Sequence, residues 1–285
     1  MSELLTIAGY GLRESLRRRM FAVVLVLTAG FLALYAFGTN QAFKDTSGFV
    51  TPDQFDLDTR VVAGAIVLGL AMFATLFLGA ALAVFLTLGI VRSDAEQGLL
   101  QPLVVRPVGR TRLLLARFVG SSAVCVVYVL GVYFATVAIT EWAGDWTPDR
   151  VLAPGLELAA GVVVVAAIST LGSVFLTATA NGIGVLMVFG AGLVAGLLGQ
   201  IGEAIDSERL RHIAEVASWV VPFEALYQDG LNRLTADTFG FTRFALQLGP
   251  FGGAQPASEL VFAWTAAYLV ALGALAALAF SRRDL

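Results

Sequence analysis

A short charged segment between two long apolar runs carries the residue types best suited to contact another protein. Within residues 94–110, Glu96 and Arg106 flank an apolar patch that consists of Leu99, Leu100, Leu103 and Val104. An amphipathic patch of this kind can dock into a groove on a partner. A plain orientation loop is the alternative, because Arg-rich loops fix the topology of membrane proteins without binding anything.

The sequence contains none of the catalytic motifs that we considered. The only lysine is Lys44, so the chain has no phosphate-binding loop of the G-x-x-x-x-G-K-[ST] type and cannot itself be an ATPase. It also lacks the His-Glu-x-x-His and Gly-x-Ser-x-Gly motifs. Cys125 and His212 are the only residues of their types, which excludes a disulfide framework or a Cys/His metal cage within one chain. We therefore predict no catalytic, cofactor or metal site, with Cys125 in the core and His212 on a solvated helix.

The composition is that of an integral membrane protein. Hydrophobic residues make up 58% of the 285 residues and charged residues only 14%, and the mean hydropathy is +0.83. A soluble domain of this length could not bury so much apolar surface.

Six transmembrane helices in an all-α fold follow from the apolar runs, because a span needs about 20 such residues. The longest run covers residues 158–201 and would be about 66 Å long as a single helix, roughly twice the membrane thickness. It must fold back, and Asn181-Gly182 is its turn signal. The predicted spans are 20–38, 61–91, 118–140, 158–180, 183–201 and 260–280.

Charge asymmetry orients this bundle, since Arg and Lys stay on the cytoplasmic side. Residues 1–19, 92–117 and 281–285 together carry a net charge of +6, whereas the segments that connect the spans on the opposite side carry −9. Both termini and the 92–117 loop are therefore expected in the cytoplasm.

The first nineteen residues are predicted to form an interfacial helix. One face of this helix is an apolar stripe that consists of Leu5, Ala8, Leu12 and Leu16. Arginines lie at its C-terminal end, next to the first span. A cleaved signal peptide is the alternative, with a small-residue site at Ala36-Phe37-Gly38. The length of the segment and its acids, Glu3 and Glu14, favour the interfacial helix.

The external segment 202–259 is long enough to hold structure of its own. Asp206 can cap one amphipathic helix, Pro222 should break it, and Phe223 should start a second. These two short helices could shape an exit from the membrane or simply lie on the outer surface.

Small and hydroxyl residues recur within the spans, and all six runs as delimited contain no charged residue. Gly192 and Gly196 form a G-x-x-x-G pair, which predicts a close helix contact either within one subunit or between subunits. A second stripe of small residues consists of Ala71, Thr75, Gly79 and Ala83, and a hydroxyl-bearing face consists of Ser169, Ser173 and Thr177. The missing charges disfavour an ion-coupled carrier, although backbone carbonyls could still bind Na⁺.

The charged segment resembles the coupling segment of ABC type-2 permeases, which contact a separate ATPase. The matching residues of the Glu-x-Gly-Thr, Pro-x-x-Arg and Lys-x-x-Gly patterns are Glu96, Gly98, Pro107, Arg110 and Gly120. Leu99 departs from the usual Thr and Arg117 from the usual Lys, and Pro102 is unusual for the segment. The order of the six runs and the basic start of the chain also fit this family.

The resemblance implies a permease subunit of an ATP-driven exporter, similar to the permeases of the multicopper and nitrous-oxide-reductase maturation group. It implies a homodimer in a prokaryotic plasma membrane, with ATP and Mg on a cytoplasmic ABC ATPase subunit. By this resemblance, Pro222 and Phe223 belong to an external gate, and the ATPase contact consists of Glu96, Gly98, Leu99, Leu100, Leu103, Arg106, Pro107 and Arg110. The G-x-x-x-G spacing, not the resemblance, assigns Gly192 and Gly196 to a subunit interface. An ion-coupled carrier and a non-transporting scaffold that transmits ATPase motion remain alternatives, and no residue pattern selects a substrate.

Overall fold

The computed structural model describes residues 19–46, 59–88, 110–234 and 255–282. Throughout these residues the secondary structure is helical, with no strand. The helices are α2 (Arg19–Thr46), α3 (Thr59–Thr87), α5 (Arg110–Gly144), α6 (Leu152–Phe175), α7 (Ala178–Ala204), α8 (Glu208–Val220), α9 (Phe223–Leu234) and α11 (Val261–Ser281). Six of these helices, all except α8 and α9, are long and apolar enough to cross a membrane, which confirms the predicted all-α membrane fold.

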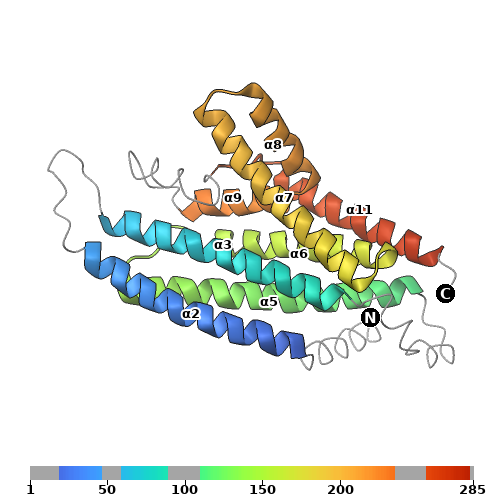
Figure 1. The fold of residues 1–285 in the computed structure, drawn as a ribbon, viewed down its shortest axis with the longest axis horizontal. Coiled ribbons are helices and arrows are strands. Elements are labelled where there is room, and N and C mark those ends of the chain that lie inside the picture. The colour runs from blue at the N-terminus through green and yellow to red at the C-terminus, as the bar shows by residue number, and fades with distance from the viewer. Residues whose placement is uncertain (1–18, 47–58, 89–109, 235–254, 283–285) are drawn as a thin grey trace.

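The long helices lie side by side along the long axis of the molecule (Figure 1). α6 is at the centre, where it packs on α3, α5, α9 and α11. α7 leaves this bundle obliquely, and α8 folds back along it as a helical hairpin (Figure 1). α2 and α11 run in opposite directions, so the first residue of α2 and the last residue of α11 point to the same end of the bundle (Figure 1).

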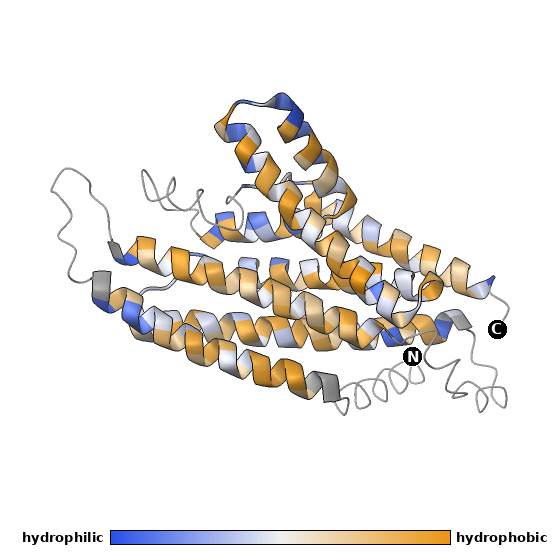
Figure 2. Cartoon of the chain, in the orientation of Figure 1, coloured by the Kyte–Doolittle hydropathy of each residue, from blue (hydrophilic) through white to orange (hydrophobic). Residues whose placement is uncertain are grey.

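Hydrophobic residues recur along all of the long helices (Figure 2), and many of them are exposed. Large side chains such as Leu34, Phe37, Met187 and Val270 are each more than 70% exposed. In water this surface would be unfavourable, but it suits the hydrocarbon core of a bilayer.

The predicted stripe of small residues on α3 packs within the chain. Ala71, Thr75 and Ala83 are buried, and a Cβ atom added to Gly79 would lie 2.7 Å from Val129 of α5 and 2.8 Å from Val162 of α6. Small residues therefore let three central helices approach closely. This confirms helix packing inside one subunit for this stripe.

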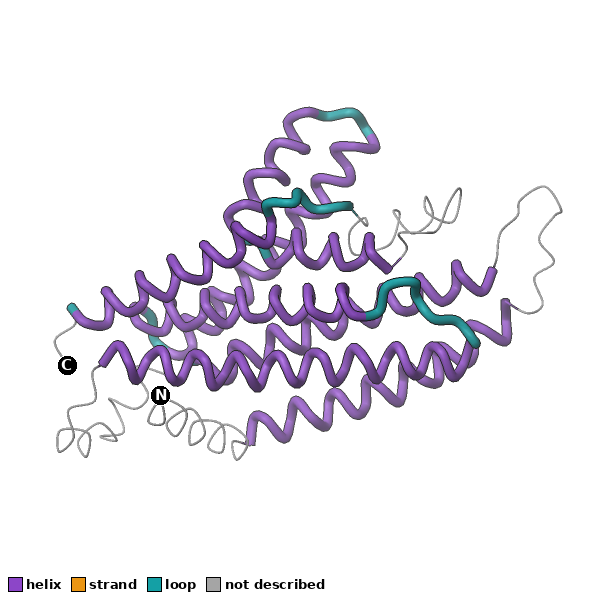
Figure 3. The backbone as a smooth tube through the Cα atoms, turned by 180° about the vertical axis from the view of Figure 1, so that it is seen from behind, coloured by secondary structure: helices purple, strands orange, loops and turns teal. Residues whose placement is uncertain are grey.

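The turn between the fourth and fifth spans differs from the prediction. It lies at Leu176 and Thr177, not at Asn181-Gly182, so these spans are α6 and α7 rather than 158–180 and 183–201 (Figure 3). Thr177 has an extended backbone and caps α7, accepting a hydrogen bond from the Ala180 amide at 3.4 Å. Asn181 is instead fully buried in the first turn of α7, where its Nδ2 donates to the Ser169 carbonyl of α6 at 2.9 Å. Asn181, a residue type common in turns, thus forms a hydrogen bond between α7 and α6.

α6 also begins earlier than the apolar run, and this brings a charged residue into a span. The helix starts at Leu152 with Pro154 in its first turn, a position where proline costs no backbone hydrogen bond. Glu157 therefore lies inside α6, where it is only 3% exposed. The expectation that the spans contain no charged residue is wrong at this position.

Candidate functional site

The two short helices predicted before the last span are α8 and α9. α8 is amphipathic and has no buried residue, whereas most residues of α9 are buried. Pro222 lies between them, as predicted, because its ring cannot continue α8. Phe223 follows as the first residue of α9 and is fully buried. The predicted gate residues thus lie where the chain passes from the exposed helix α8 to the buried helix α9.

α9 is seated on the glycine face of α7. The Phe223 ring stacks on Phe189 of α7, with ring centroids 5.0 Å apart. A Cβ atom at Gly192 would lie 2.6 Å from Phe223 Cζ, and a Cβ atom at Gly196 would lie 2.6 Å from Glu224 Cδ. The predicted close contact at these glycines is therefore present, but its partner is α9 of the same chain. The assignment of the pair to a subunit interface stays a prediction.

A cluster of three charges, two of them buried, ties the C-terminal end of α9 to α6. Arg233 Nε lies 2.8 Å from Glu157 Oε1 and 2.8 Å from Asp229 Oδ2, and both carboxylates are at most 5% exposed. Asp229 Oδ1 also accepts a hydrogen bond from the Ala257 amide at 3.0 Å. The guanidinium compensates two carboxylates that would otherwise be costly to bury. The cluster fixes α9 against α6 and against the segment that leads into α11.

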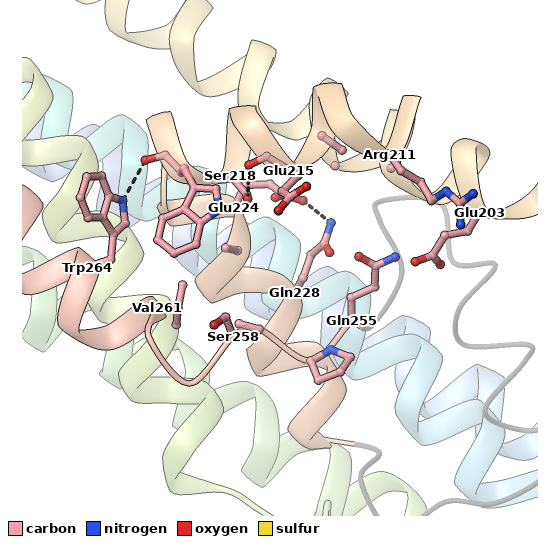
Figure 4. Close-up of a pocket in the computed structure, with 17 residues that line it drawn as sticks. Glu203, Arg211, Glu215, Ser218, Glu224, Gln228, Gln255, Ser258, Val261 and Trp264 are labelled. Carbon is pink, nitrogen blue, oxygen red and sulfur yellow. Dashed lines mark hydrogen bonds between the residues drawn. The ribbon is translucent and has the colours of Figure 1, made fainter. Parts of the chain in front are cut away.

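A cavity of about 450 Å³ opens between α7, α8, α9 and the start of α11. Figure 4 shows Glu224 and Gln228 of α9 at its wall, with Trp264 at one side and Glu203 and Arg211 at the other. Its lining includes two indoles, three carboxylates and one guanidinium: Trp219, Trp264, Glu203, Glu215, Glu224 and Arg211. Trp219 and Trp264 meet edge to face, and Trp264 Nε1 donates to the Trp219 carbonyl at 2.8 Å. The volume falls within the range of small-molecule sites.

Glu224 is the most deeply placed carboxylate of this cavity. It is 6% exposed, and Gln228 Nε2 donates a hydrogen bond to its Oε1. Burial raises the pKa of Glu224 to about 7, although the hydrogen bond from Gln228 acts in the opposite direction. The cation of the lining, Arg211, pairs with Asp206 at 2.9 Å. Among the described residues, Glu224 therefore has no ion-pair partner.

The hydroxyl face of α6 does not form a polar path. Ser169 accepts a hydrogen bond from Thr87 Oγ1 at 2.6 Å, and Ser173 donates to the Thr170 carbonyl at 2.7 Å. Thr177 caps α7. These groups satisfy one another and the backbone, as hydroxyls in membrane helices often do.

The remaining single residues are placed as predicted. Cys125 is fully buried in the main core, and His212 is exposed on α8. No group of three or more His, Cys, Asp or Glu residues is arranged to hold a metal ion within the part of the chain that the structure describes.

Most of the predicted coupling segment lies outside the described residues, and so do residues 1–18 of the predicted interfacial helix. Arg110 alone is placed, as the first residue of α5. The predictions for Glu96, Gly98, Leu99, Leu100, Leu103, Arg106 and Pro107 thus stay predictions.

Six helices that can cross a membrane define a multi-pass membrane protein. Comparison with known protein families identifies which family of membrane proteins it is. The model of the ABC-2 family transporter protein matches residues 5–285, nearly the whole chain. The chain therefore belongs to this family and is a permease subunit of an ABC transporter, which implies a partner subunit that binds ATP. No curated protein matches the chain.

Sequence reasoning missed the residues that hold α9 in place. Glu157 is far in sequence from Asp229 and Arg233, and it lies just outside the apolar run that is predicted as a span. Pro154 was the available signal, because a proline shortly before an apolar run often marks the first turn of a helix. Glu224 and Gln228 were recognisable only as one face of a short helix.

Proposed function

We propose that the chain is the membrane-spanning subunit of an ATP-driven exporter, coupled through residues 94–110 to a cytoplasmic ABC ATPase. The observation that carries the proposal is the family match over residues 5–285, joined to a six-helix bundle. The absence of a phosphate-binding loop supports a separate ATPase, which would bind the ATP and Mg.

The proposed arrangement is a homodimer in a prokaryotic plasma membrane with both termini in the cytoplasm. The charge split of +6 and −9 supports this orientation, and the common direction of the ends of α2 and α11 agrees with it (Figure 1). In this orientation α9 and its cavity belong to the outer half of the permease. Closure of the ATPases would move the spans, and Phe223, packed on α7, would transmit that motion to α9.

An ion-coupled carrier is the second candidate, because Glu157 is a buried charged residue within a span. Ionisable residues at such positions often mark ion pathways. Here, however, Glu157 already pairs with Arg233, which gives it a structural role. The family match favours the ATP-driven exporter.

Transport by the reconstituted complex separates these candidates. The chain would be co-expressed with its partner ABC ATPase and placed in vesicles. An exporter requires ATP hydrolysis and keeps working when ion gradients are collapsed. Transport that follows an imposed ion gradient without ATP would favour the carrier. ATP hydrolysis without any transport of candidate cargo would favour the scaffold that transmits motion.

A further inference from the structure

The cavity beside α9 contains a buried charge without a described counter-ion. Glu224 is only 6% exposed, and its described hydrogen-bond partner is Gln228. A buried carboxylate without a cation is unfavourable, so the site favours either a proton or a positively charged ligand.

The other lining residues agree with a positively charged ligand. Glu203 of α7 and Glu215 of α8 add two carboxylates, whereas the charge of Arg211 is offset by Asp206 at 2.9 Å. Trp219 and Trp264 supply two indoles, each 38% exposed, so their faces are partly accessible. Indole is the aromatic group that attracts cations most strongly.

The size and composition of the cavity indicate an organic cation rather than a metal ion. Its volume of about 450 Å³ far exceeds that of a single ion and lies in the range of small-molecule sites. No metal-binding group of His, Cys, Asp or Glu is found among the described residues.

We infer that this cavity binds an organic ammonium cation, whose charge pairs with Glu224 and whose alkyl or aryl groups lie against Trp219 and Trp264. The identification of that cation as the exported cargo rests on the proposed function, whereas the binding itself does not. Glu203 and Glu215, at the rim, attract the cation toward the buried carboxylate.

The site should respond to pH through Glu224. The other charged groups that line the same cavity are Glu203 from α7 and Arg211 and Glu215 from α8, and Tyr227 of α9 interacts electrostatically with Glu224; the described lining from α11 and residues 255–258 contributes no titratable group. Because burial raises the pKa of Glu224 to about 7, a proton competes with the cation near neutral pH. Affinity for the cation should therefore rise between about pH 6 and about pH 8.

Calorimetric titration with benzyltrimethylammonium tests the inference directly. The full chain would be held in nanodiscs of uncharged or zwitterionic lipid, and neopentylbenzene, in which carbon replaces the nitrogen, is the matched neutral probe. We expect saturable binding of the cation and binding of the neutral isostere that is weaker by about tenfold or more. Equal binding of the two probes would overturn the inference and needs no variant that might misfold.

Glu224→Gln, which keeps the shape of the side chain, should weaken binding of the cation by about tenfold or more and remove its pH dependence. Glu141→Gln is the matched control, because Glu141 is exposed at the end of α5 and does not line the cavity. Wild-type affinity in a folded Glu224→Gln variant would also overturn the inference.

ATP-driven uptake of the same probe by inside-out vesicles distinguishes binding of the cation from its export as cargo. Binding without ATP-driven uptake would leave the cation site in place and reject its role as a cargo site. Absence of saturable binding, in a complex whose ATPase still co-purifies and is stimulated, would reject the cation site and leave the proposed function standing.

Discussion

Arg233 Nε lies 2.8 Å from Glu157 Oε1, and this contact joins the short helix α9 to the central span α6. The same nitrogen lies 2.8 Å from Asp229 Oδ2, so one guanidinium holds two buried carboxylates. The phenol oxygen of Tyr133 and Oε2 of Glu157 are both buried without a hydrogen-bond partner in the described structure. Because Arg233 contacts both Glu157 of α6 and Asp229 of α9, the placement of α9 depends on this cation.

Arg233→Met should destabilise the protein by about 2 to 4 kcal/mol, because it leaves Glu157 and Asp229 buried without a cation. This value lies below the usual cost of a fully buried pair, since the Arg233 side chain is 30% exposed. The measurement is the free energy of unfolding in mixed detergent micelles. Arg211→Met is the matched control and should cost at most about 1 kcal/mol, because its partner Asp206 is 92% exposed. Equal effects of the two changes would contradict the assigned role.

Gly192→Ala should destabilise the chain by about 1 to 3 kcal/mol, because the added Cβ would lie 2.6 Å from the Phe223 ring. Gly190→Ala is the control on the same helix, since its Cβ would meet no atom within 4 Å. That change should be neutral or stabilising by about 0.5 to 1 kcal/mol, as expected for alanine in a helix. Thermal unfolding checks both.

The same glycine variants test where the contact lies. An intrachain contact predicts that Gly192→Ala lowers the stability of the subunit itself, measured as loss of thermal stability that does not vary with protein concentration. Dissociation of an otherwise stable subunit, seen by size-exclusion chromatography with light scattering, would support the subunit-interface interpretation.

The glycines also show what the sequence could and could not reveal. The G-x-x-x-G spacing predicted a close contact, and Pro222 predicted the break before α9, because both depend on local geometry. The partner of the glycines was not predictable, since Phe223 reaches them only through the tertiary fold. Glu157 was not predicted for a related reason: its compensating charge, Arg233, lies on α9, which is distant in sequence. Asn181-Gly182 was misread as a turn because the buried hydrogen bond to Ser169 outweighs local turn propensity.

Stability should depend on pH through Glu224. Its pKa is raised by burial from 4.5 to about 7, so between these values the folded protein holds a proton that the unfolded chain has lost. The free energy of unfolding should therefore fall as pH rises from 4.5 to about 7, by on the order of 3 kcal/mol, and level off above. Glu224→Gln should remove this part of the pH profile. Identical profiles for the wild type and the variant would show that the carboxyl is not buried as described.

Both termini are expected in the cytoplasm. A cysteine at Ser281 should resist an impermeant thiol reagent in intact cells, whereas one at Ser207, in the turn before α8, should react. The native Cys125 adds little background, because it is fully buried. Labelling after the membrane is opened provides the control for access to Ser281. Reaction at both positions in intact cells would contradict the topology.

Residues 94–110 are proposed to dock on an ATPase, and co-purification of that ATPase with the Leu100→Asp variant tests this docking most directly. The variant would bury an unpaired carboxylate in the docking groove, so we expect the ATPase to be lost or its stimulated turnover to fall by about tenfold or more. Gln101→Asp introduces the same charge beside the apolar patch and should retain the ATPase. Single charge reversals at Glu96 and Arg110 should have milder effects, because exposed charges contribute only about 0 to 1 kcal/mol. Wild-type ATPase recovery and turnover in Leu100→Asp, at normal expression, would contradict the claim.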